Sequence, residues 1–165
     1  MNTNVHELVR LLEEELSLHK ELLANIASER DILRRFAVRE LDENSKTKET
    51  LILKIRLMEE ARRNVSAQLA RSLNEEEDLS LSRIADSAPQ PWKKRLQELQ
   101  AELIDIMGQI QALNSHNRSM AVYATGTMTH LLSLFAFATG KSGIYDQAGR
   151  SRGQSGCPVM ISQSV

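Results

Sequence analysis

The chain has 165 residues, a formal net charge of -1 and 4% aromatic residues. This length suits one domain, and the near-neutral charge excludes attraction of nucleic acid by net charge alone. The lone Cys157 excludes an internal disulfide, and the first residues lack the basic and apolar run of a secretory leader, so we expect a cytoplasmic protein.

The first expected helix covers residues 4–41. Asn4 followed by Glu7 resembles a capping box, in which the two side chains satisfy free N–H groups at a helix start. Apolar residues then recur at helical spacing: Val5, Leu8, Leu12, Leu16, Leu23, Ile26, Leu33 and Phe36. The polar run Asp42-Glu43-Asn44-Ser45 predicts a turn after this helix.

A second helix is expected over residues 46–74, with an apolar stripe in which Arg62 occupies a position suited to an apolar side chain. Its aliphatic stem is predicted to lie along the surface while the charged end reaches water. Residues 75–91 lack a sustained period and include Pro89 and Pro91, which indicates a linker.

A third helix is predicted over residues 92–139. Its apolar positions alternate in steps of four and three, the seam of a left-handed coiled coil: Trp92, Leu96, Leu99, Leu103, Ile106, Ile110, Leu113, Asn117 and Met120. The expected fold is all-α, an elongated antiparallel bundle or coiled coil of three long helices. Residues 1–139 form this bundle, and residues 140–165 form a flexible tail.

No residue pattern predicts an enzyme, a cofactor or a metal site. Thr139-Gly140-Lys141-Ser142 resembles the end of a phosphate-binding loop, but Phe135 stands where that motif needs a small residue. The histidines lack the spacing of zinc ligands. The short basic clusters are interrupted by acids, so no nucleic-acid-binding face is expected.

Asn117 interrupts the apolar seam of the third helix, and Asn114 lies one turn before it. A polar residue at such a position fixes the register of packed helices at some cost in stability. Two interpretations stay open: a hydrogen bond that fixes the register within the chain, or contact with the backbone of a partner protein.

The stretch from Ser119 to Gly140 contains no charged residue. Its length approaches that of a membrane span, but threonine, serine and histidine interrupt it, so no stable membrane insertion is expected. A helix that is apolar on most sides must be covered on most sides. The residues expected to bind a partner are Met120, Ala124, Met128, Leu131, Leu134, Phe135 and Phe137. Permanent burial in a homo-oligomer is the alternative, and the oligomeric state stays open.

Three patterns, in this order along the chain, resemble the FlgN family of flagellar export chaperones. They are Lys48-x-x-Leu51-Ile52-x-x-Ile55-x-x-Met58-Glu59-x-x-Arg62, then Leu113-Asn114-x-x-Asn117, then Gly143-Ile144-Tyr145-Asp146-x-x-Gly149-Arg150. The first resembles the family's middle helix, the second the paired asparagines of its long last helix, and the third the short tyrosine-containing element that follows.

The resemblance implies a cytosolic chaperone of the hook–filament junction proteins FlgK and FlgL. Such a chaperone binds the C-terminal helical segment of its client, prevents premature assembly and delivers the client to the gate or ATPase complex of the export apparatus. The family places client binding in the C-terminal part, and it implies docking of Tyr145 on the export gate, although Asp146 stands where the family often has glycine. The alternative function is a structural coiled-coil oligomer without a transient client.

Overall fold

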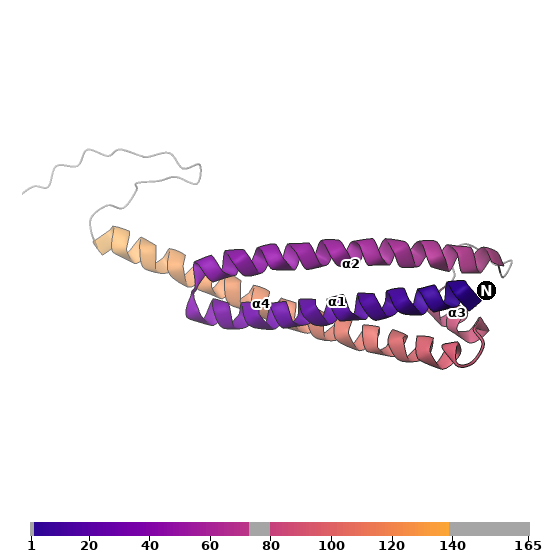
Figure 1. Ribbon diagram of the computed structural model, residues 1–165. Coiled ribbons are helices and arrows are strands. Elements are labelled where there is room, and N and C mark those ends of the chain that lie inside the picture. The colour runs from indigo at the N-terminus through magenta and orange to yellow at the C-terminus, as the bar shows by residue number, and fades with distance from the viewer. Residues whose placement is uncertain (1, 73–79, 139–165) are drawn as a thin grey trace, which may run out of the picture. The chain divides into compact units, whose positions relative to one another are not determined.

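The structure is a computed structural model that describes residues 2–72 and 80–138. Every regular element in these ranges is a helix: α1 (Asn2–Arg35), α2 (Val38–Ser72), α3 (Leu81–Ser87) and α4 (Trp92–Ala138) (Figure 1). The all-α prediction is confirmed. The chain divides into two compact units, Met1–Met120 and Ala121–Val165, and α4 contributes to both. The expected tail at residues 140–165 lies outside the described residues and stays a prediction.

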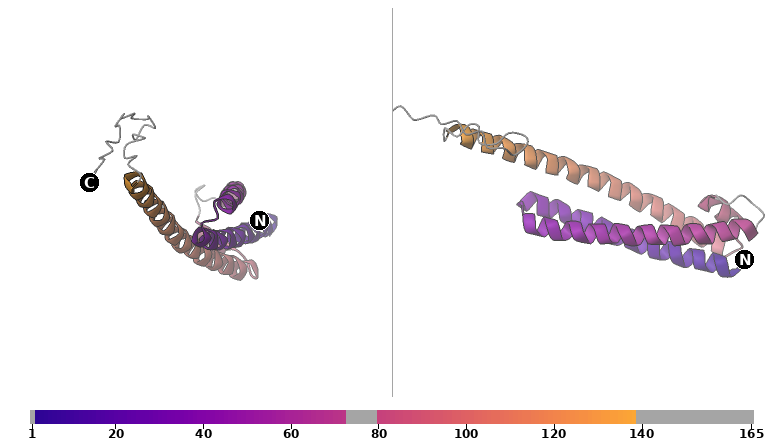
Figure 2. Two further views of the ribbon diagram at one scale, coloured as in Figure 1. Left: turned by 90° about the vertical axis from the view of Figure 1, so that its left-hand side faces the viewer. Right: turned by 90° about the horizontal axis from the view of Figure 1, so that it is seen from above.

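Helices α1 and α2 form a long hairpin in which the two helices lie side by side and run in opposite directions (Figures 1 and 2). Apolar residues at helical spacing on α1, among them Leu8 and Leu12, face Leu69 of α2 in a shared core. Burial of each such leucine contributes about 2 kcal/mol. The hairpin therefore forms because both helices carry a stripe that neither can bury alone.

The turn of this hairpin lies at Phe36 and Ala37, and the prediction of a turn at Asp42–Ser45 was wrong. Phe36 adopts a left-handed conformation with φ of 53°. Its N–H donates to Leu33 O at 3.2 Å, and the N–H of Ala37 donates to Ile32 O at 3.3 Å. This pair of bonds is a Schellman motif, which ends a helix by satisfying its last carbonyl groups.

The polar run expected to break the chain instead continues α2. Lys46 and Asp42 form an ion pair one turn apart, and the hydroxyl of Thr47 donates to the carbonyl of Glu43. Asn44 exchanges hydrogen bonds with Asn25 of α1, each side-chain amide donating to the other residue's backbone carbonyl at 3.2 and 3.3 Å. Cap-forming residues thus serve here as helix-surface and interhelical groups.

The expected linker at residues 75–91 contains a helix that the sequence pattern did not indicate. In α3, the hydroxyl of Ser80 accepts a hydrogen bond from the backbone N–H of Arg83 and caps the first turn. Ile84 and Ala85 are buried in the same core as the hairpin. This helix was missed because only one turn carries apolar residues.

The first part of α4, up to Met120, runs in the same direction as α1 and completes this core (Figures 1 and 2). Its buried residues are those of the predicted seam: Leu96, Leu99, Leu103, Ile106 and Asn117. The start of α4 at Trp92 also agrees with the prediction. The period of four and three residues therefore located this helix and its buried face.

Candidate functional site

A polar layer joins α1, α2 and α4 within the first unit. The carboxylate of Glu29 on α1 accepts a hydrogen bond from Lys48 Nζ of α2 at 2.6 Å and from Asn117 Nδ2 of α4 at 2.9 Å. Asn117 Nδ2 also donates to Ile26 O at 2.8 Å, and Asn117 is only 2% exposed. The amide nitrogen of Asn117 is therefore engaged by its own chain.

A second polar layer joins α1 and α2 nearer the open end of the hairpin. Arg62 Nε of α2 donates to Glu15 Oε2 of α1 at 2.9 Å, and His19 Nδ1 lies 2.8 Å from Glu15 O. The sequence predicted that the charged end of Arg62 would reach water. It pairs inward instead, because the carboxylate of Glu15 is buried and a buried charge requires a partner.

The two layers share one spacing. Glu15 and Glu29 are two heptads apart on α1, and their partners Arg62 and Lys48 are two heptads apart on α2. A shift of one helix along the other would leave these four charges without partners. The layers therefore fix the register of the hairpin, and the sequence pattern from Lys48 to Arg62 reflects helix packing.

Asn114 differs from Asn117 although one turn separates them. Asn114 is exposed, whereas Asn117 is buried against α1. The structure therefore does not bring the two amides to one contact within the chain. Asn114 remains available on the outer face of α4, and its contact with a partner stays a prediction.

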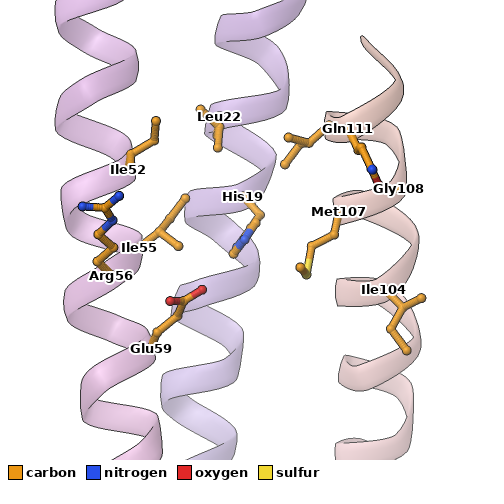
Figure 3. A pocket seen from close by; sticks show the side chains of 11 residues that line it. His19, Leu22, Ile52, Ile55, Arg56, Glu59, Ile104, Met107, Gly108 and Gln111 are labelled. Carbon is orange, nitrogen blue, oxygen red and sulfur yellow. The ribbon is translucent and has the colours of Figure 1, made fainter. Parts of the chain in front are cut away.

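An open groove lies between α2 and α4, with α1 as its floor (Figure 3). Its volume is about 580 Å³. His19 and Leu22 form part of the floor, Arg56 and Glu59 lie on the α2 side, and Met107 lies on the α4 side. The described residues contain no cluster of His, Cys, Asp and Glu that could hold a metal ion. The groove is mainly an apolar surface.

The last part of α4, residues 121–138, is here called the apolar end of α4. Large apolar side chains in it are exposed to solvent: Val122, Tyr123, Met128, Leu131, Leu132, Leu134, Phe135 and Phe137. Of the residues predicted to bind a partner, Met128, Leu131, Leu134, Phe135 and Phe137 belong to this exposed set, whereas Met120 and Ala124 are half-buried. The set of residues predicted to bind a partner did not include Val122, Tyr123 and Leu132, which are exposed as well.

The threonine and serine hydroxyl groups of the apolar end are bonded to its own backbone. Thr125 donates to Ala121 O at 3.0 Å, Thr127 to Tyr123 O at 3.0 Å, Thr129 to Thr125 O at 2.9 Å and Ser133 to His130 O at 2.7 Å. Such bonds turn the methyl and methylene groups outward. Each of these four hydroxyl donors therefore keeps its acceptor when an apolar partner covers the helix.

By length and composition, α4 could also cross a membrane, which for one such helix is weak evidence. Tyr145 and the Thr139–Ser142 run lie outside the described residues, so the expected docking residue has no structural description.

A helical hairpin held in register by buried charges, with a long helix that ends in exposed apolar side chains, is typical of a helical protein-binding protein. The FlgN protein family matches residues 1–153, and the chain therefore belongs to the FlgN family. This family comprises flagellar export chaperones, which gives the chain a role in flagellar protein export. No curated protein and no solved structure matches the chain.

Proposed function

We propose that the chain is a cytosolic, non-enzymatic chaperone that binds the C-terminal helical segment of the junction proteins FlgK and FlgL. It would prevent their premature assembly and deliver them to the export apparatus. Membership in the FlgN family supports the class of client. We further propose that α1, α2 and the part of α4 up to Met120 act as an elongated antiparallel bundle of three long helices that holds the client-binding segment.

The exposed apolar end of α4 is the observation that carries this proposal. The client-binding residues are Met120, Ala124, Met128, Leu131, Leu134, Phe135 and Phe137. Exposed apolar side chains in contiguous array mark an interaction surface, and methionine adapts its shape to different partners. An amphipathic client helix would lie along this segment with its apolar stripe inward.

The test is a calorimetric titration of the chain with the C-terminal segment of FlgK or FlgL. Met128→Asp places a carboxylate in the proposed contact, where the client would remove it from water. We expect a loss of about 2 kcal/mol or more, roughly thirtyfold in Kd.

Met107→Asp is the matched control. Met107 and Met128 lie on the same helix and both are 54% exposed, but Met107 lines the groove of the first unit. The proposal predicts that Met107→Asp leaves the Kd unchanged within about twofold. Equal losses for both variants, or a loss for Met107→Asp alone, would place the client elsewhere.

We propose that Tyr145 docks the loaded chaperone on the cytosolic domain of the export gate. A tyrosine adds a large apolar surface while few torsions are ordered. Tyr145→Ala should then weaken binding to that domain in a pull-down while the Kd for the client stays the same. Unchanged gate binding would remove this role from Tyr145.

A further inference from the structure

The apolar side chains of residues 121–138 lie on all sides of the helix. Three pairs of exposed apolar residues are nine positions apart: Val122 with Leu131, Tyr123 with Leu132, and Met128 with Phe137. At about 3.6 residues per turn, nine residues make about two and a half turns. The two members of each pair therefore point in opposite directions, and the three pairs point along three different directions.

One neighbouring helix covers a stripe of roughly 100° on the helix it packs against. A single client helix on the Leu131 side would leave Val122 on the opposite side in water. Phe137, which is 79% exposed, would likewise remain bare if the client covered only Met128. One helix therefore cannot bury the apolar end of α4.

The side that carries Val122 also has room for a close neighbour. Gly126 lies one turn after Val122 and therefore on the same face. A glycine inside a helix costs about 1 kcal/mol relative to alanine. Yet a Cβ atom added at Gly126 would have no atom of the described residues within 4 Å, apart from the two adjacent residues and the nearby backbone of its own helix. The packing of the described residues does not account for this glycine, whereas the close approach of a second helix on this face would account for it.

The chemistry of the segment also limits what can cover it. Residues 121–138 contain no Asp, Glu, Lys or Arg, and His130 is their one side chain that can take up a positive charge. Their serine and threonine hydroxyls donate hydrogen bonds to the helix backbone. The complementary cover is uncharged and apolar on every face that touches the helix. It need not supply acceptors for these hydroxyls.

We propose that the client supplies at least two helical segments that enclose residues 121–138 from opposite sides, each with an uncharged apolar face. This inference rests on the proposed function and adds the form of the client to it. The chaperone–client complex is then a small bundle with the apolar end of α4 as its central helix.

Two variants of the full chain test this inference against the C-terminal segment of the junction protein. Leu131→Asp and Val122→Asp place a carboxylate on opposite sides of the same helix. Enclosure predicts that each variant weakens binding by roughly tenfold or more. Ala112→Asp, an exposed position upstream on α4, is the control and should leave binding unchanged.

The outcomes separate the two proposals. If only one of the two variants weakens binding, a single helix is bound, so enclosure is wrong while the proposed function stands. If neither does, the apolar end of α4 is not the client site and the proposed function fails as well. If the client segment does not bind but phosphatidylglycerol vesicles do, in a manner abolished by both variants, a bilayer is the cover and both proposals are wrong.

A labelling experiment gives the same answer without a buried charge. In a Cys157→Ser chain, Val122→Cys and Leu131→Cys are labelled with a maleimide, with and without the client segment. Enclosure predicts that the client slows labelling at both positions by roughly tenfold or more. Labelling that stays fast at either position in the saturated complex overturns it.

Discussion

At the scale of single residues, Glu29 of α1 joins three helices in the register layers. Its carboxylate accepts from Lys48 of α2 and Asn117 of α4. Each partner is at least partly buried, so removal of the carboxylate leaves a cation and an amide in a poorly solvated position. Loss of a buried partner is far more costly than loss of a surface ion pair.

Glu29→Ala is therefore expected to lower the free energy of unfolding by about 2 kcal/mol, a value reduced from that of a fully buried pair because Lys48 retains some exposure. The measurement is urea unfolding followed by circular dichroism. Asp42→Ala, which breaks the exposed pair with Lys46, is the control and should change stability by less than about 0.5 kcal/mol. Equal effects of the two substitutions would contradict the claim that the carboxylate of Glu29 stabilises the packing of the helices.

The polar layers could have been found in the sequence. Glu15, His19 and Glu29 continue the steps of three and four residues set by Val5, Leu8 and Leu12, and Lys48 and Arg62 occupy such positions on the second helix. Charges of opposite sign on two seams two heptads apart predict paired layers. The sequence interpretation followed Leu16 and Leu23 instead, which lie beside this seam, and so it missed the acidic partners.

At the scale of the helices, the position of the hairpin turn was predicted wrongly because the residue that ends α1 is of an unusual type for that role. A left-handed residue after a helix is usually glycine or asparagine, but this chain has Phe36. No local preference of phenylalanine marks such a position. By contrast, the seam of α4 was predictable over its full length, because a sustained period is a stronger signal than a single end residue.

Phe36→Gly is expected to stabilise the hairpin by about 1 kcal/mol, because glycine adopts the left-handed conformation without the steric cost borne by other residues. Little packing is lost, since Phe36 is 67% exposed. Thermal unfolding measures the effect. Phe36→Ala removes the same ring but keeps the Cβ atom, so it should give no gain; a similar gain for alanine would show that the ring, and not the backbone, is the source.

At the scale of the whole molecule, the sequence predicted the helical class, the last long helix and the family. It also predicted the stretch without acidic or basic residues in which the proposed client-binding residues lie, and that this stretch is apolar on most sides. The exposure of each of these side chains could not be predicted, because it depends on how the helices of the chain pack against one another.

Hydrogen–deuterium exchange of the full chain, with and without a saturating C-terminal segment of FlgK or FlgL, tests the central claim most directly. Fast exchange is expected at the amides of residues 121–138 in the free chain, since few apolar contacts protect them, with strong slowing when the client binds. The amides of α1 and α2 should change little. Residues 121–138 that are already fully protected in the free chain, or that stay unprotected in the complex, would contradict the account.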